Sequence, residues 1–364
     1  MTQIQRYVNR ITSYKRRRAG VPRTQRSSPR ASIPVARVDL YHQFANHFKG
    51  LRISQSAMPT PEYSVELQQG EPPPEILEYA RQHCGEDPNT RLQAICELRE
   101  LIYERGECTP HRMDDEFLIR FLRARNFIPQ RAHRLMANYY QFKEDYPELF
   151  DVYPMDLHAI GDANVITVPP YKDQDGRRLL LWRVGCWDPK TISVEELFKA
   201  TVLSLELGVL EPQNQILGGV ALFDLEDLST QHAWQVTPSV ASKIVKLLVS
   251  CFPANTHAIH VINHSWIFDK IYNIFRPFLN SVMRSRIFFH GYDVTSLHKH
   301  IHPDHLPKRY GGIWPDYSYT IWLESLKKNK EVAKEMIKCG YKFRDYEVSP
   351  EVLRQLKDEG IKLF

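Results

Sequence analysis

The sequence predicts an α/β protein in which a helical bundle precedes a mostly parallel β-sheet flanked by helices. Residues 74–146 carry apolar side chains at three- and four-residue intervals, which is typical of amphipathic helices. Short apolar runs then alternate with helical stretches over residues 164–291, and such alternation favours parallel strands joined by helices. The charged and apolar fractions of 25% and 43% are those of an ordinary folded protein.

The N-terminal region differs from the rest in charge. Residues 1–38 hold ten Arg or Lys and no Asp or Glu, so the remainder holds 38 basic against 43 acidic side chains. The region is rich in Ser and Pro, and residues 1–57 are predicted to be a disordered basic extension. Apolar residues from Ile4 to Tyr14 recur at helical spacing. This pattern fits a mitochondrial presequence, a membrane-surface helix, a nuclear signal or a solvated tail.

Four helices are expected after a linker that ends near residue 73. Residues 74–87 and 89–106 both show helical periodicity. The third helix opens at Asp114, whose short acidic side chain suits an N-cap. The fourth starts at Pro129, which is favoured at a first helical position.

The sheet region begins with a hairpin, because Asp175-Gly176 separates two alternating apolar runs. Further strands are expected at 218–228, 257–263 and 286–291. Helices are expected at 191–211, 237–252, 266–285, 319–340 and 350–360.

The stretch Trp266–Gly291 is unusually apolar for a chain of this composition. Two rows of large apolar side chains, starting at Ile267 and Phe268, run along one helical face. Pro277 has no N–H to donate, so we expect a kink or two short helices. Leaving about ten such side chains in water would cost on the order of 10 kcal/mol or more. This face therefore needs a cover, which is the protein's own core, a ligand or a membrane.

No enzyme motif emerges from the sequence. A phosphate loop, a dinucleotide-binding glycine motif, a nucleophile elbow and an H-E-x-x-H zinc helix are all absent. The acids of "FDLED", from Asp224 to Asp227, are expected to cap the next element. The five histidines between His290 and His305 have a spacing that zinc or copper sites use, but a solvated loop is favoured. We therefore expect no enzyme, no catalytic residue, no cofactor and no metal.

The cellular setting is constrained by two features. The six cysteines form no C-x-x-C pair and indicate reduced thiols in an intracellular protein. No apolar run reaches the roughly 18–20 residues of a transmembrane helix, and the N-terminus lacks the apolar core of a secretory signal.

Six motifs in order resemble the CRAL-TRIO family of lipid-transfer proteins, over residues 75–320. Within the family the chain is most similar to α-tocopherol transfer protein, retinaldehyde-binding protein and the clavesins, in particular arthropod-type members. The motifs are "FLIRFLRARNF", "DQDGRRLLLWRVG", "GGVALFDLEDLS", "FPANTHAIHVIN", "RPFLNSVMRSRIFFHG" and "LPKRYGG".

The resemblance implies the CRAL-TRIO fold, in which a mobile helical lid closes an apolar cavity that holds one lipid molecule. The stretch at 265–286 matches this lid. The implied organisation is a disordered extension (1–57), a linker with the N-terminal helical lobe (58–150), a lipid-binding lobe (151–318) and C-terminal helices (319–364).

The resemblance also implies three sets of site residues. Each apolar position alone is common in any α/β core, so these residues carry weight only as a set. The lipid-binding set is Phe198, Thr201, Val202, Leu205, Phe223, Ile244, Leu247, Leu248, Phe252, Phe268 and Phe275. The membrane and lid set is Trp234, Trp266, Ile271, Ile274 and Phe278. The phosphoinositide set is Arg125, His257, Arg276, Arg284 and Arg286.

The phosphoinositide set agrees less well with the family pattern. Asn255 and His257 stand where the tocopherol protein has a lysine and an arginine, and Val282 replaces another lysine. Losing three charges weakens the binding of a polyanionic headgroup.

The function implied is an intracellular carrier for a tocopherol, a retinoid or a similar lipid, which it exchanges at membranes. The alternative is a phosphoinositide-sensing membrane adaptor. The expected partners are a hydrophobic lipid and a membrane surface, with contact to phosphoinositide left open and no nucleic acid. We expect a monomer that is cytoplasmic and peripheral on intracellular membranes.

Overall fold

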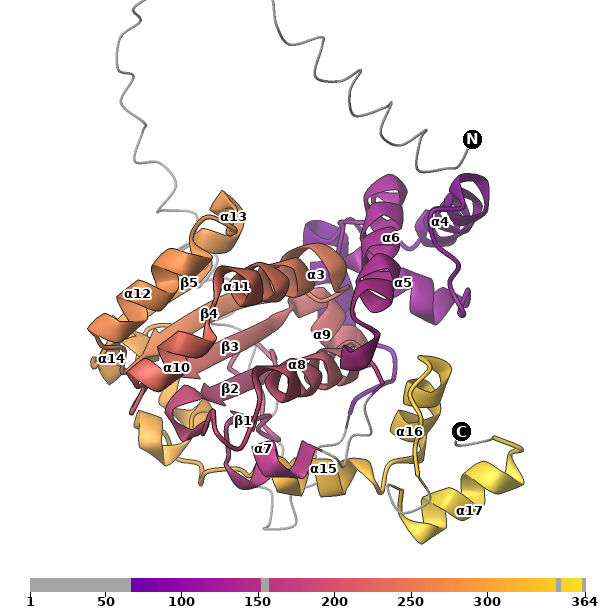
Figure 1. Cartoon of the computed structure of the whole chain (residues 1–364). Coiled ribbons are helices and arrows are strands. Elements are labelled where there is room, and N and C mark those ends of the chain that lie inside the picture. The colour runs from indigo at the N-terminus through magenta and orange to yellow at the C-terminus, as the bar shows by residue number, and fades with distance from the viewer. Residues whose placement is uncertain (1–66, 152–156, 345–347, 362–364) are drawn as a thin grey trace, which may run out of the picture. The chain divides into compact units, whose positions relative to one another are not determined.

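The computed structural model describes residues 67–151, 157–344 and 348–361 (Figure 1). They form a helical bundle, a five-stranded sheet with helices around it, and a group of C-terminal helices. The predicted fold class is therefore confirmed. The basic extension at 1–57 lies outside the described residues, and its disorder stays a prediction.

The helical bundle forms where the capping residues and periodicity indicated. The carboxylate of Asp114 accepts a hydrogen bond from the N–H of Phe117 at 3.0 Å. Gly106 follows the second helix with a φ of 58°, a left-handed conformation that glycine adopts without strain. The bundle consists of α3 (Pro74–His83), α4 (Arg91–Arg105), α5 (Asp115–Arg123) and α6 (Pro129–Asp145).

The sheet has its strands in chain order. The strands are β1 (Ile166–Thr167), β2 (Leu179–Arg183), β3 (Gly219–Asp224), β4 (Thr256–Ile262) and β5 (Ile287–Gly291). β1 is antiparallel to β2, and the other three pairings are parallel. The turn between β1 and β2 includes Gly176, which has a φ of 82°. It is held by Asp173, whose Oδ1 accepts the N–H of Arg177 at 2.7 Å.

The remaining helices surround the sheet. They are α7 (His158–Asp162), α8 (Val194–Gly208), α9 (Pro212–Leu217), α10 (Thr230–Gln235), α11 (Pro238–Val245), α12 (Trp266–Phe275), α13 (Ser281–Arg284), α14 (Val294–His298), α15 (Tyr319–Leu326), α16 (Lys330–Lys338) and α17 (Pro350–Asp358). A π-helical turn, Lys246–Cys251, extends α11. The sequence analysis did not predict α7, α9, α10 and α14, since each has only five or six residues and is too short to establish a periodic pattern.

The predicted break at Pro277 is confirmed. α12 ends at Phe275 and α13 begins at Ser281. The side chain of Asn280 caps α13 by accepting the N–H of Met283 at 2.8 Å. The apolar stretch is thus divided into two short helices.

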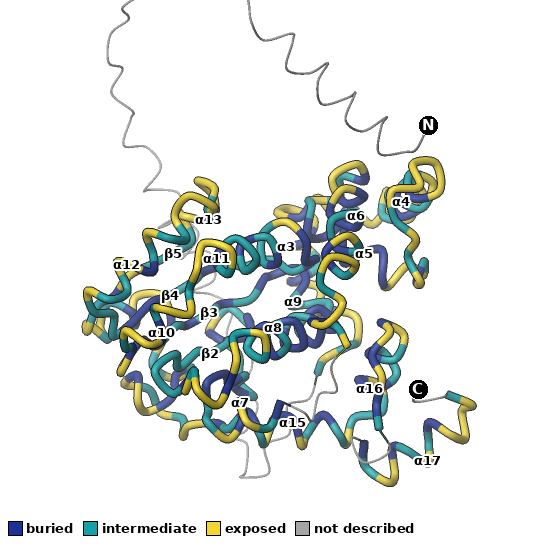
Figure 2. Tube along the Cα trace, in the orientation of Figure 1, coloured by how far each residue is buried: buried dark blue, intermediate teal, exposed yellow. Residues whose placement is uncertain are grey.

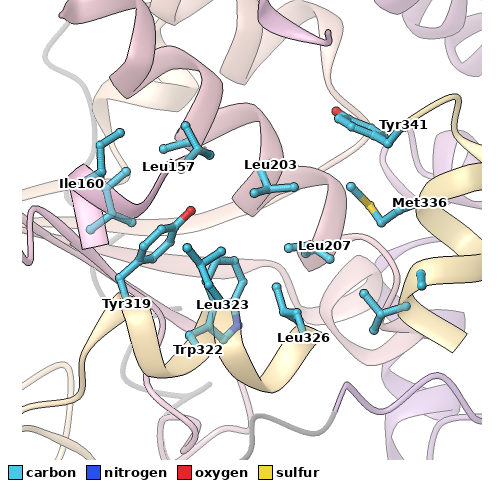
Figure 3. Packing of buried hydrophobic residues seen from close by; sticks show 14 of the residues in the cluster. Leu157, Ile160, Leu203, Leu207, Tyr319, Trp322, Leu323, Leu326, Met336 and Tyr341 are labelled. Atoms are coloured by element: carbon cyan, nitrogen blue, oxygen red, sulfur yellow. The ribbon is translucent and has the colours of Figure 1, made fainter. Parts of the chain in front are cut away.

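Separate apolar cores stabilise the sheet and the helices around it. On one face, Leu181 and Leu222 pack against α14 and against Tyr310. A second core lies where α15 packs on α8. There the side chains of Tyr319, Trp322 and Leu323 contact those of Leu203 and Leu207 (Figure 3). The strands and α8 are largely buried or intermediate, whereas α13 is mostly exposed (Figure 2).

Candidate functional site

The face of the sheet opposite α14 forms the floor of a cavity. Pairing between strands sets two rows across this floor, one through Leu180, Ala221 and Ile259 and one through Trp182 and Phe223. The rings of Trp182 and Phe223 stack with centroids 5.8 Å apart. Along β3 the floor side chains increase in size from Gly219 through Ala221 to Phe223. The floor therefore leaves most room at the start of β3.

Helices α8 and α11 and the π-helical turn supply the walls. Phe198, Thr201 and Leu205 come from α8. Leu247 and Leu248 lie on the π-helical turn, and an inserted π-turn of this kind is frequent at functional sites.

The cavity has a volume of about 270 Å³. This is close to the lower end of the roughly 300–1,000 Å³ that ligand pockets enclose. Most of its wall is aliphatic or aromatic, so a hydrophobic molecule is the guest that it fits.

One end of the cavity carries a buried ion pair. Nη2 and Nε of Arg178 donate to the two carboxylate oxygens of Glu211 at 2.7 and 2.8 Å. Burial alone would favour the protonated acid, but the hydrogen bonds and charge of Arg178 hold the pKa of Glu211 below its ordinary value. Both charges are thus compensated inside the wall.

The segment before α3 closes the same end. Leu67 lines the cavity, and the N–H of Gln68 donates to Oε1 of Glu211 at 2.9 Å. Lys172 donates to Oε1 of Gln68 at 2.8 Å. The chain is therefore attached to the rim of the cavity at this point.

Seven of the eleven residues in the lipid-binding set line the cavity: Phe198, Thr201, Leu205, Phe223, Ile244, Leu247 and Leu248.

 The hydroxyl of Thr201 donates to the carbonyl oxygen of Leu197 at 2.7 Å, so its hydrogen is already used within α8.

The other four members of the set lie elsewhere. Val202 and Phe252 are buried in the core of the helical bundle, where the ring of Phe252 lies 5.7 Å from that of Tyr139. Phe268 and Phe275 do not line the cavity. They pack in a cluster with Leu225, Val261 and Ile271, which also includes the cavity-lining Phe223.

The lid residues divide between two environments. Trp234 and Trp266 are 81% and 64% exposed, and Phe278 is 39% exposed. Ile271 is buried and Ile274 is intermediate. The exposed members belong to α10, α12 and the start of the α12–α13 connection, and α12 packs against both α10 and α11.

The phosphoinositide set is not brought together as five available cations. Arg125 donates to the carbonyl oxygen of Val249 at 3.1 Å, and Arg286 donates to that of Thr256 at 2.6 Å. Burial, together with the nearby cations of Arg177 and Arg286, lowers the pKa of His257 to about 4. Arg276 and Arg284 are exposed.

The expected solvated histidine loop is only partly correct. His290 is 6% exposed and shares a hydrogen bond of 2.9 Å with His260. His298 pairs with the carbonyl oxygen of Tyr310 at 2.8 Å, whereas His300 and His302 are exposed. Among the described residues, no group of His, Cys, Asp or Glu is arranged to hold a metal.

The prediction that the acids from Asp224 to Asp227 cap the next element is wrong for Asp224, because the N-cap of α10 is Ser229. The carboxylate of Asp224 accepts hydrogen bonds from Tyr310 and Asn263, both at 2.9 Å, and from the N–H of Glu226 at 3.0 Å. Its hydrogen bonds tie the end of β3 to its neighbours.

The sequence analysis missed the polar end of the cavity. Arg178, Glu211 and Asn214 line it, and Arg178 lies 33 positions before Glu211 in the sequence. The hairpin and the end of α8 were each predicted, but no signal in the sequence joins Arg178 to Glu211.

Comparisons with known proteins agree with this architecture. A family model described as the CRAL/TRIO domain matches residues 162–312. Clavesin-1 of Pongo abelii is 34% identical over 256 residues, which covers 70% of this chain and 72% of that protein. Clavesin-2 of Homo sapiens is 32% identical over 303 residues, covering 78% of this chain and 93% of that protein.

A crystal structure of Sfh5 matches 65% of this chain and 91% of its own, with a TM-score of 0.41 and 13% identity. In the part of the chain that the structure describes, no helix has the length and apolar character needed to cross a membrane. On the strength of the family model and the clavesin relatives, the chain belongs to the CRAL/TRIO family of lipid-binding and lipid-transfer proteins.

Proposed function

We propose that this protein is a carrier that binds one hydrophobic lipid in its cavity, such as a tocopherol, a retinoid or a similar terpenoid, and exchanges it at membranes. The observation that carries this proposal is the apolar cavity between the sheet, α8 and α11. Transferring an apolar ligand from water to such a wall contributes about 25 cal/mol per Å². The protein's own part is to bind and release the lipid, without a chemical reaction.

Docking to a membrane is supported by exposed side chains of α10, α12, α13 and the α12–α13 connection. Trp234, Trp266, Phe278 and Val282 are 39–81% exposed. They lie on neighbouring elements, since α10 packs on α12, and exposed apolar side chains on adjoining elements mark interaction sites. Tryptophan is also favoured at membrane interfaces. In this proposal the protein is cytoplasmic, monomeric and peripheral on intracellular membranes.

The proposed lid consists of α12 and α13, residues 266–284. α12 packs on α10 and α11, and these two helices supply Gln235 and Val240 to the cavity wall. In our proposal, membrane contact draws α12 away from this wall and allows α10 and α11 to part. The lipid then leaves between them.

A phosphoinositide-sensing adaptor is the less favoured function. Arg125 and Arg286 are engaged with main-chain carbonyl groups, and only Arg276 and Arg284 of that set are exposed arginines. Two exposed cations attract an anionic surface by about 1 kcal/mol each, which is weak and screened by salt.

A transfer assay tests the carrier. Donor vesicles that contain a fluorescent tocopherol analogue are mixed with empty acceptor vesicles, with and without the protein. The proposal expects catalytic amounts of protein to accelerate transfer. Binding to vesicles without accelerated transfer would support the adaptor instead.

A further inference from the structure

The polar end of the cavity contains an unpaired hydrogen-bond acceptor. Nδ2 of Asn214 donates to the carbonyl oxygen of Gly208 at 2.8 Å. This contact fixes the orientation of the amide, because the opposite orientation would set two oxygens against each other. Oδ1 of Asn214 is then buried and has no partner among the described residues. A buried acceptor without a partner is costly, so it calls for one.

Space for a partner exists beside this oxygen. Gly208 and Gly219 both line the cavity and carry no side chain. A methyl group built on Gly219 would lie 3.8 Å from Oδ1 of Asn214 and 3.8 Å from the carbonyl oxygen of Arg178, its nearest neighbours outside the adjoining chain. Such distances are ordinary van der Waals contacts. The recess formed by Gly208, Asn214 and Gly219 therefore has room for a group of about that size.

The polar groups at this end select against an acidic ligand. Arg178 is already paired with Glu211 through two hydrogen bonds. Lys172 also attracts the Glu211 carboxylate, but its ammonium is held at the rim by Oε1 of Gln68. A ligand carboxylate or phosphate in the recess would set a charged acceptor against Oδ1 of Asn214 and has no hydrogen to donate to that oxygen.

A second buried polar group of the wall that lacks a partner among the described residues, Nε1 of Trp322, does not discriminate between neutral ligands. As a donor it suits any ligand oxygen, whether of an alcohol, an ether or a carbonyl. Oδ1 of Asn214, in contrast, requires a ligand that donates a hydrogen.

We propose that the recess binds the hydroxyl group of a neutral lipid alcohol, whose O–H donates to Oδ1 of Asn214. The hydrocarbon part of the lipid extends along the floor toward Trp182 and Phe223. This inference rests on the proposed function of the cavity as a lipid site, and it adds the chemical class of the lipid and the residue that selects it.

Displacement of diphenylhexatriene from the full-length protein tests the inference. This fluorescent hydrocarbon has no hydrogen-bonding group. The competitors are hexadecanol, its methyl ether and palmitate, which share a chain and differ in the terminal group. Since one hydrogen bond contributes about a factor of ten, we expect hexadecanol to compete about tenfold better than either of the others.

Three variants locate the effect. Asn214→Leu removes the acceptor, and Gly219→Ala fills the recess while retaining Asn214, so both are expected to abolish the preference for hexadecanol. Asn138→Leu is the matched control: Asn138 lies on α6 and does not line the cavity, and its amide donates to the carbonyl oxygen of Ser250 at 3.1 Å. With this variant the preference is expected to persist. Thermal unfolding of each variant shows that it is folded.

The outcomes separate the inference from the proposed function. Equal competition by hexadecanol and its methyl ether in the unaltered protein would overturn the lipid-alcohol inference and leave the carrier intact. The same holds if Gly219→Ala is folded and keeps the preference. If diphenylhexatriene and all three competitors fail to bind, the carrier itself is refuted.

Discussion

Replacing Trp234 and Trp266 with alanine tests how the protein reaches a membrane. The two side chains are 81% and 64% exposed. With about 250 Å² for each tryptophan, together they present roughly 360 Å² to water. If half of this area enters the bilayer interface at about 25 cal/mol per Å², the contribution is about 4 kcal/mol, or roughly a thousandfold in partitioning.

Sedimentation with neutral phosphatidylcholine vesicles measures the partition coefficient, at low and at high salt. We expect the double variant to lose about two to three orders of magnitude at both salt concentrations, because the apolar contribution is not screened. Tyr103→Ala is the matched control. Tyr103 is 72% exposed but lies on α4 in the helical bundle, so its removal is expected to have little effect.

Three results would refute this reasoning. One is equal partitioning of the double variant and the unaltered protein. Another is an equal loss in the Tyr103→Ala control. The third is binding that requires anionic lipid and disappears at high salt, since that behaviour follows from basic residues and favours the adaptor.

Three further predictions concern stability and the cavity. Arg123→Leu leaves the carboxylate of Glu86 buried without its bidentate partner at 2.8 Å, so the free energy of unfolding in urea should fall by about 3 kcal/mol; a loss below about 1 kcal/mol would contradict this. Burial lowers the pKa of His260 to about 3 and that of His290 to about 4. Below about pH 6.5 the unfolded chain therefore binds more protons than the folded one, and the free energy of unfolding should fall as the pH drops toward 4. Denaturant unfolding at pH 7 and pH 5 should show a smaller decrease for His260→Phe, and an unchanged decrease would count against it. Ala221→Leu fills the cavity floor, so lipid binding should weaken about tenfold or more without loss of folding; undiminished binding would mean that the lipid lies elsewhere.

The regular elements could be predicted because their signals are local. The Asp114 cap, the turn at Gly176 and the break at Pro277 each depend on a few adjacent residues. The cavity wall was predicted in part, since seven residues of the set carried over from the family line it. Val202 and Phe252 face the helical bundle instead, because residues on one helix can serve two different cores.

The polar end of the cavity could not be predicted, because it depends on long-range contacts. Leu67, Arg178 and Glu211 meet only after the sheet and α9 have formed, and Gln68 is bonded to a residue 143 positions away. The position of the lid helix is a similar case. The periodicity of residues 266–275 predicted their apolar face, but only the structure shows that Phe268 and Phe275 do not line the cavity.

The most direct test of the carrier is to identify what the protein holds in its own cells. Native mass spectrometry and lipid extraction, performed on protein purified from that source, give the stoichiometry and the chemistry of the ligand. The account predicts one neutral hydrophobic lipid per chain, and Ala221→Leu should reduce its amount. A cavity without lipid, with phosphoinositide captured only at the surface, would contradict it.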